Sequence, residues 1–180
     1  MPDEMQIIER VLCGDSAEFR WIVERYQQPV MSIVRHLAGE STDCEDIAQE
    51  VFLSAFRHLK SFDVQRSRFS TWLFTIARNK SMNALRDRRT ISLRNRPARS
   101  HSDEPTELLE RAEVFRELDN ALIRLPDRYR RAFVLSEFEG LPYDQIAQIE
   151  GIGLGTVKSR IHRAKAMLQC ALARFRNEKP

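Results

Sequence analysis

A predicted helix near the end of the chain carries cations and small polar residues on one side, which suits DNA recognition. At about 100° per residue over 154–175, Ser159, His162 and Arg163 share one face, with Lys158 on its flank. Cations can bind phosphates, small residues permit close approach, and polar donors can bind base edges in the major groove. The alternative is an amphipathic helix whose basic face is simply solvated.

Aromatic residues interleaved with cations and amides occupy a second segment, 61–89. Unstacked bases bind against aromatic rings, amides bind base edges and arginines bind phosphates, so the pattern predicts contact with single-stranded DNA. The alternative is that the aromatic residues, which recur at helical spacing, pack helices together. The residues concerned are Arg66, Arg68, Phe69, Trp72, Phe74, Arg78 and Asn79.

A third set of residues forms the polar face of a helix predicted over 45–60. On this face Asp46, Gln49 and Glu50 surround Leu53, an aliphatic residue among acids and amides. A lone exposed leucine is common, but one set among charges can centre a small protein-docking surface. The opposite half of the helix is apolar and predicted to be buried, through Ile47, Ala48, Val51, Phe52, Ala55, Phe56 and Leu59.

Helices must position all three sets, because the composition favours an all-α fold. Only 6 glycines and 7 prolines occur in 180 residues, which is too few for a turn-rich β fold. After Pro126 the pattern predicts a helix, then a short helix over 143–149, a turn at 151–153 and the long helix 154–175. Two helices joined by a tight glycine-containing turn are the outline of a helix-turn-helix. The predicted buried stripe of the long helix is Val157, Ile161, Ala164 and Leu168.

The chain divides into two small helical domains joined by a flexible linker. We expect a first domain over 1–90, a linker over 91–107 with almost no apolar residues, and a second domain over 108–180. Residues 1–90 hold 13 Lys and Arg and 13 Asp and Glu, whereas residues 121–180 hold 11 and 6, a net charge of +5. Because phosphate-binding modules are cationic, this distribution favours the C-terminal domain as the part that binds duplex DNA.

The sequence also excludes several classes of protein. It has no run of about 18 apolar residues and no apolar N-terminal core, so we expect neither a membrane span nor a signal peptide. Cys13, Cys44 and Cys170 are scattered and odd in number, which favours reduced thiols in a cytoplasm. The histidines lack metal-ligand spacing and no P-loop or paired cysteines occur, so we expect no enzyme activity, metal or cofactor.

Three segments, in a fixed order, resemble a known family. They read DIAQEVFLSAFRHLKSF, RFSTWLFTIARNKSMNALRDRR and LPDRYRRAFVLSEFEGLPYDQIAQIEGIGLGTVKSRIHRAKAML. Over about residues 5–87 and 108–172, the chain resembles a bacterial RNA polymerase sigma factor of the extracytoplasmic-function (ECF) type, in the sigma-70 superfamily. The resemblance implies a region 2-like and a region 4-like helical domain and a role in promoter-specific transcription initiation. A stand-alone helix-turn-helix regulator is the alternative.

The resemblance further implies partners and residue roles. The expected partners are core RNA polymerase, through the clamp helices of its largest subunit and the flap of its second-largest, promoter DNA, and a cognate anti-sigma factor. The expected location is the bacterial cytoplasm, with membrane attachment only through the anti-sigma factor. The implied contacts are Asp46, Gln49, Glu50 and Leu53 with polymerase; Arg66, Arg68, Phe69, Trp72, Arg78 and Asn79 with the single-stranded −10 element; and Thr156, Lys158, Ser159, Arg160, His162 and Arg163 with the −35 element.

Overall fold

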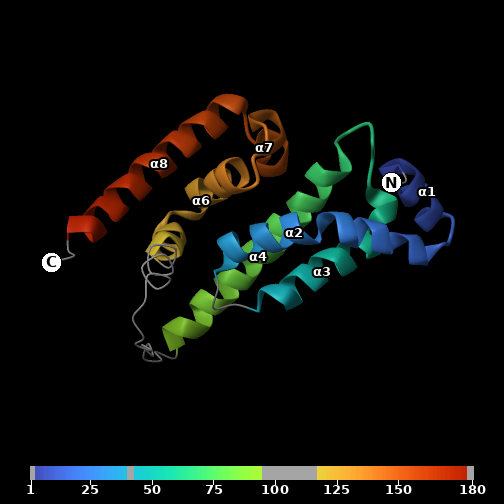
Figure 1. Ribbon diagram of the computed structural model, residues 1–180, viewed down its shortest axis with the longest axis horizontal. Coiled ribbons are helices and arrows are strands. Elements are labelled where there is room, and N and C mark those ends of the chain that lie inside the picture. Colours follow the sequence, from blue (N-terminus) through green and yellow to red (C-terminus); the bar gives the residue numbers. More distant parts are fainter. Residues whose placement is uncertain (1–2, 40–42, 95–116, 178–180) are drawn as a thin grey trace.

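The computed structural model describes residues 3–39, 43–94 and 117–177, and within these ranges it contains helices and turns but no strand (Figure 1). The predicted all-α fold is therefore confirmed. The N-terminal helices are α1 (Glu4–Leu12), η1 (Ser16–Glu18), α2 (Phe19–Ala38), α3 (Cys44–Arg57), η2 (Leu59–Ser61) and α4 (Phe69–Arg94). Residues 117–124 are helical, and α6 (Asp127–Phe133), η3 (Val134–Phe138), α7 (Tyr143–Glu150) and α8 (Leu154–Asn177) follow.

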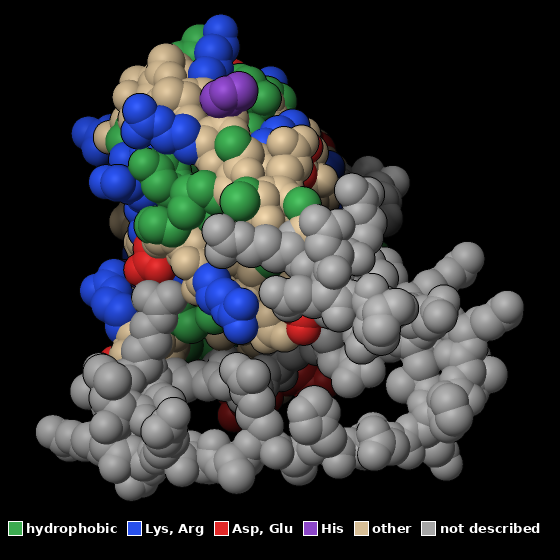
Figure 2. Space-filling view, turned by 90° about the vertical axis from the view of Figure 1, so that its left-hand side faces the viewer, with side chains coloured by type: hydrophobic (Ala, Val, Ile, Leu, Met, Phe, Trp, Pro, Cys, Tyr) green, Lys and Arg blue, Asp and Glu red, His purple; other side chains and the backbone are tan. Residues whose placement is uncertain are grey.

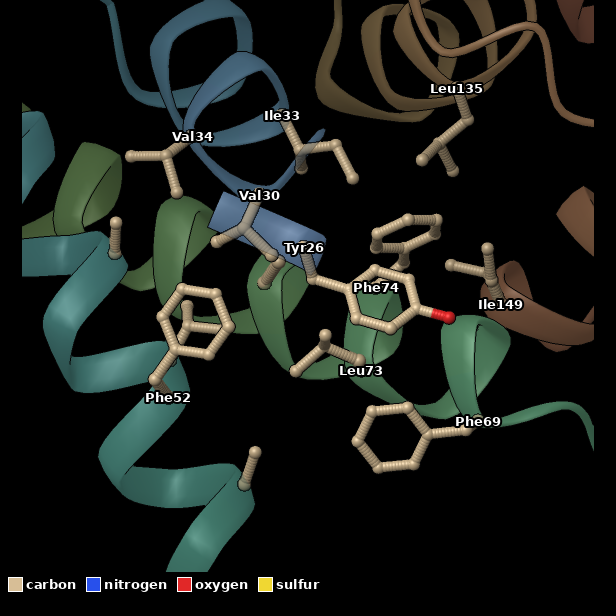
Figure 3. Close-up of a cluster of buried hydrophobic side chains, with 14 of the residues drawn as sticks. Tyr26, Val30, Ile33, Val34, Phe52, Phe69, Leu73, Phe74, Leu135 and Ile149 are labelled. Atoms are coloured by element: carbon tan, nitrogen blue, oxygen red, sulfur yellow. The ribbon is translucent and has the colours of Figure 1, made fainter. Parts of the chain in front are cut away.

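The core of the N-terminal domain lies between α2, α3 and α4. On α2 the apolar residues Ile22, Tyr26, Val30, Ile33 and Leu37 recur at spacings of three and four, and all are buried. This periodicity places them on one side of the helix, where they meet buried side chains of α3 and α4 (Figure 3). The burial of one face of α2 thereby fixes the two helices that carry the predicted docking and strand-binding residues.

Helix α3 differs from its prediction at its end and in one side chain. It begins after Asp43, whose carboxylate accepts a hydrogen bond from the backbone N–H of Asp46 at 3.4 Å and so caps the helix. It ends at Arg57, and the next residues form the 3₁₀ turn η2. The predicted burial of Phe56 is wrong, because this residue is 40% exposed; its ring makes an edge contact with Phe19, at 5.2 Å between ring centroids.

Helix α4 runs past the predicted end of the first domain. It continues to Arg94, four residues beyond the predicted end of the domain, and the boundary between domain and linker stays a prediction. No glycine or proline interrupts the sequence between Phe69 and Pro97, and arginine is a good helix former, so the helix has no local reason to stop at 90. The rest of the predicted linker, 95–107, lies outside the described residues.

A tight turn joins the two helices of the predicted helix-turn-helix. Helix α7 ends at Glu150 and is capped by Gly151, which has a left-handed backbone with φ of 64° that glycine adopts at little cost. The backbone N–H of Ile152 then donates to the carbonyl of Ala147 at 3.0 Å, which closes the helix end. The predicted buried stripe of α8 is confirmed, since Val157, Ile161, Ala164 and Leu168 are all buried.

The two domains pack directly against each other. Helix α2 contacts η3, and α4 contacts α7. Leu135 and Ile149 of the C-terminal domain point toward Ile33 and Phe74 of the N-terminal domain, and all four belong to one apolar cluster (Figure 3). The sequence predicted two linked domains but gave no sign that they share a core.

Candidate polymerase and DNA interfaces

The outward face of α8 presents most of the residues predicted to bind duplex DNA. In the upper half of Figure 2, where the C-terminal helices lie, Lys and Arg side chains outnumber acidic ones. The Ser159 hydroxyl donates to the Thr156 carbonyl at 3.0 Å, and the Arg163 guanidinium donates to the Tyr129 hydroxyl at 3.4 Å. These bonds hold two polar side chains of this face in place. Its exposed predicted residues are Thr156, Lys158, Ser159, His162 and Arg163.

The sixth predicted residue of α8, Arg160, lies apart from that exposed face. Its guanidinium is half-buried and pairs with a carboxylate oxygen of Glu150 at 3.3 Å. Glu150 also accepts two hydrogen bonds, each 3.0 Å long, from Nε of Arg131. Arg160 therefore connects α8 to α7 through an ion pair. It does not belong to the exposed face formed by the other five predicted residues of α8.

One further cation of α8 is already paired. Lys165 donates to the Glu137 carboxylate at 2.9 Å, and this hydrogen bond raises the pKa of Lys165 and lowers the pKa of Glu137. Both side chains are partly exposed, so the pair contributes little to stability. Among the cations that the sequence placed near this face, Lys158 and Arg163 are the exposed ones without a carboxylate partner in the described structure.

The loop before α4 is shaped by its own side chains. One Asp63 carboxylate oxygen accepts from the backbone N–H of Gln65 at 2.9 Å, and the other lies 3.3 Å from Nε of Arg66. Arg66 and Arg68 are exposed. The loop thus has a local turn that holds its backbone while two guanidinium groups face solvent.

The aromatic residues of α4 divide into core and surface. Phe69 is only 1% exposed and Phe74 is also buried, so both side chains pack in the core, as the alternative interpretation of the aromatic residues expected. Trp72 is half-buried and lies 5.6 Å from Phe62 and 5.5 Å from Phe69 between ring centroids. Of the two aromatic residues predicted to capture a base, Trp72 has the accessible ring and Phe69 supports it from behind.

The two polar residues farther along α4 are placed very differently. Asn79 is exposed. Arg78 is directed at the C-terminal domain, where its guanidinium donates to the Ile149 carbonyl and lies 3.6 Å from the Glu150 carboxylate. Burial lowers the pKa of the Arg78 guanidinium below its usual value, and the nearby Glu150 opposes that shift. In this conformation Arg78 is not available to DNA.

All four residues of the predicted docking face on α3 are exposed to solvent. Asp46, Gln49 and Glu50 are exposed, and Leu53 among them is 46% exposed. Glu50 also accepts a hydrogen bond from Lys80 of α4 at 3.1 Å. This bond connects the docking face to the helix of the predicted strand-binding segment.

The sequence analysis did not identify Glu150, a glutamate whose side chain is buried and forms several ion pairs. Its side chain is 0% exposed, and Arg78, Arg131 and Arg160 all contact it. A signal was present, because Glu150 is four residues after the buried Ile146 and so lies on the apolar side of α7. A carboxylate on the buried side of a helix needs cationic partners, but the sequence alone does not show which cations these are.

Comparison with known families matches both domains. Residues 22–91 match the family described as Sigma-70 region 2, and residues 115–168 match the family described as Sigma-70, region 4. These matches cover more than half of the chain and include the helices that carry the three surfaces. The chain belongs to the sigma-70 family.

Full-length relatives support the same family. The RNA polymerase sigma-H factor of Pseudomonas aeruginosa is 33% identical over 181 residues, covering 94% of this chain and 93% of the relative. The ECF RNA polymerase sigma factor SigW of Bacillus subtilis is 34% identical over 174 residues, covering 90% and 92%. Among solved structures, the sigma factor RpoE in complex with the anti-sigma factor NepR from Bartonella quintana covers 87% of this chain and 97% of its own, with 26% identity and a TM-score of 0.68.

This sigma factor is of the alternative, ECF type and directs promoter-specific transcription initiation, and it is not an enzyme. The stand-alone regulator is not favoured, because the region 2 match accounts for the N-terminal domain as well. Within the described ranges, no helix is both long enough and apolar enough to span a membrane. The same ranges contain no cluster of three His, Cys, Asp or Glu side chains that could hold a metal ion.

Proposed function

We propose that three exposed surfaces of this sigma factor have separate roles: α3 binds core polymerase, α4 binds the opened −10 element and α8 binds the −35 element. The observation that carries this proposal is the placement of three distinct exposed surfaces on the helices that match regions 2 and 4, in chain order. Each surface has the residue types that its partner requires. Each can be tested separately, because the surfaces lie on different helices.

The face of α3 binds the clamp helices of the largest core subunit. Leu53 supplies its apolar centre and is 46% exposed, so covering it on binding contributes about half of the roughly 1.5–3 kcal/mol that complete burial of a leucine gives. Asp46, Gln49 and Glu50 form the polar rim, and the Glu50 bond to Lys80 couples this rim to α4. The flap of the second-largest subunit binds the C-terminal domain.

The segment from the 63–67 loop through α4 captures the non-template strand of the −10 element. A flipped base stacks on Trp72, with Phe69 behind the ring, while Arg66 and Arg68 bind phosphates and Asn79 binds a base edge. Unstacking a base costs a few kcal/mol, and stacking on an aromatic ring returns about 1–3 kcal/mol. The two values nearly cancel, so strand opening depends on polymerase contacts rather than on this chain alone.

Helix α8 binds the −35 element in the major groove. Lys158 and Arg163 bind phosphates, while Ser159 and His162 face base edges. Thr156 lies in the first turn of the helix, where a small residue permits close approach. Each phosphate that a cation neutralises releases counterions, so binding weakens as salt rises.

An anti-sigma factor is the remaining proposed partner. The relative RpoE is described in complex with the anti-sigma factor NepR, which supports a partner of the same class for this chain. Because bacterial polymerase and promoters lie in the cytoplasm, the chain acts there, and any membrane attachment comes through the anti-sigma factor.

Reconstituted transcription tests the proposed function. Purified core polymerase, the full chain and a library of randomised promoter templates should yield start sites on templates that share two sequence elements at a fixed spacing. Core polymerase alone supplies the background. Start-site selection no better than that background would overturn the proposal.

A further inference from the structure

We propose that Glu4, on α1, is a positioning residue for base capture: it holds Tyr26 in place and thereby sets the position of the Trp72 ring. The inference rests on the proposed function for the binding of a base at Trp72. Glu4 lies outside residues 22–91, which match the Sigma-70 region 2 family, so that match assigns it no role. In this proposal Glu4 does not touch DNA and acts only through the buried aromatic side chains behind Trp72.

The contact on which the inference depends joins α1 to α2. The hydroxyl of Tyr26 donates a hydrogen bond to a carboxylate oxygen of Glu4. Nε of Arg25 lies 3.9 Å from the same oxygen, and the Arg25 guanidinium lies 5.8 Å from the centroid of the Tyr26 ring. Burial, and after it the hydrogen bond to Glu4, raises the pKa of the Tyr26 hydroxyl above its usual value. The hydroxyl therefore keeps its proton and remains a donor to Glu4.

The ring of Tyr26 lies among the aromatic side chains that support Trp72. Its centroid is 5.8 Å from that of Phe69 and 6.0 Å from that of Phe74 (Figure 3). The centroid of Phe69 in turn lies 5.5 Å from that of Trp72. Tyr26, Phe69 and Phe74 are all buried, and a close-packed interior transmits a displacement because it has little free volume to absorb it. A shift of Tyr26 therefore reaches Trp72 through one intervening ring.

Helix α1 also adjoins the element that brings a second ring to Trp72. Its buried apolar side chains anchor it in the N-terminal core. It contacts the 3₁₀ turn η2, and Phe62 directly follows that turn. The centroid of Phe62 lies 5.6 Å from that of Trp72 and 5.3 Å from that of Phe69. The supports of Trp72 therefore meet α1 at two places, the Glu4 contact with α2 and the contact with η2.

Removal of the Glu4 carboxylate would leave the buried Tyr26 hydroxyl without its acceptor. A hydroxyl without a partner is unfavourable in apolar surroundings, so the ring would move toward water or toward another acceptor. Removing the hydroxyl as well relieves this cost, because replacing both partners of a hydrogen bond by apolar groups can be nearly neutral. The inference therefore predicts that Tyr26→Phe suppresses the effect of Glu4→Ala. Two unrelated packing defects would add instead.

Tryptophan fluorescence reports the Trp72 ring in the full chain. The chain has two tryptophans, so Trp21→Phe leaves Trp72 alone. In this background Glu4→Ala should raise the acrylamide quenching constant of Trp72 and shift its emission to longer wavelength, because the displaced ring meets more water. Glu4→Gln should keep the wild-type values, since its amide oxygen still accepts from Tyr26. Glu9→Ala is the matched control, because it removes an exposed glutamate from the same helix.

The double variant keeps the test decisive if Glu4→Ala folds poorly. Glu4→Ala combined with Tyr26→Phe should recover both the helical circular dichroism and the Trp72 quenching of the wild type. A double variant that recovers neither would overturn the inference. So would unchanged Trp72 quenching in a folded Glu4→Ala, or an equal rise in Glu9→Ala.

Promoter opening by the reconstituted holoenzyme gives the functional readout. With 2-aminopurine in the −10 strand, Glu4→Ala should reduce the open complex about three- to tenfold, the lower part of the loss expected for one stacked base, and Glu4→Gln should open as the wild type does. Binding of duplex promoter should not change. If Trp72→Ala impairs opening and Glu4→Ala does not, the inference fails alone. If neither variant impairs opening, the proposed role of Trp72 fails.

Discussion

Replacing Trp72 by alanine should impair promoter opening far more than initial promoter binding. Trp72 is half-buried and packs one side against Phe62 and Phe69, at 5.6 and 5.5 Å between ring centroids, which leaves part of its ring for a base. Stacking of one base is worth about 1–3 kcal/mol, so its loss should reduce the open complex about 5- to 150-fold. The −35 contacts on α8 are untouched, so duplex binding should change by less than about twofold.

Two readouts on the same holoenzyme separate these steps. Fluorescence of 2-aminopurine in the non-template strand of the −10 element reports opening, and anisotropy of labelled duplex reports initial binding. Trp21→Ala is the matched control, because it removes another half-buried tryptophan from α2. Thermal unfolding of both variants measures any general loss of packing. Equal losses of opening and of binding for Trp72→Ala, or an equal opening defect in Trp21→Ala, would refute the stacking role.

Three further predictions concern the other surfaces. Leu53→Asp should weaken binding to core polymerase at least tenfold in a fluorescence titration, because it places a charge at the apolar centre of the docking face, whereas Leu12→Asp, at a similarly exposed leucine of α1, should bind as the wild type does. Lys158→Ala and Arg163→Ala should each weaken −35 binding and reduce the slope of log K against log salt by about 1, and an unchanged slope in both would move the phosphate contacts elsewhere. Burial raises the pKa of Glu139, and a hydrogen bond from Ser32 opposes it, so the folded state holds this proton more tightly than the unfolded state. Stability against unfolding should therefore decrease as pH rises from about 4 through the raised pKa, relative to Glu139→Gln, and parallel curves for the two proteins would contradict this assignment.

The sequence predicted those features that depend on one helix at a time. The buried stripe from Val157 to Leu168 follows from the helical period alone, and Gly151 marks the turn because its backbone is left-handed. The exposed Leu53 could be found because an aliphatic residue interrupted a polar face. In each case the signal was local, so no tertiary contact was needed to read it.

Features that depend on two helices from different domains could not be predicted. Arg78 has the sequence context of a DNA-binding cation, yet the structure directs it to Glu150, 72 residues further along the chain. Phe69 and Trp72 belong to the same aromatic segment and both contact Phe62, but Phe69 also packs against Tyr26 and is buried, whereas Trp72 is half-buried. Spacing gives the face on which a residue lies, but not the neighbour that covers it.

Site-specific photo-crosslinking within the initiation complex tests the central claim most directly. A benzophenone amino acid placed at Leu53, Trp72 or Ser159 in the full chain, assembled with core polymerase and promoter DNA, reports the nearest partner of each surface. The three positions should crosslink to the largest polymerase subunit, to the non-template strand of the −10 element and to the −35 duplex, respectively. Crosslinks from Trp72 to duplex −35 DNA, or from Ser159 to the −10 strand, would contradict the division of work between α4 and α8.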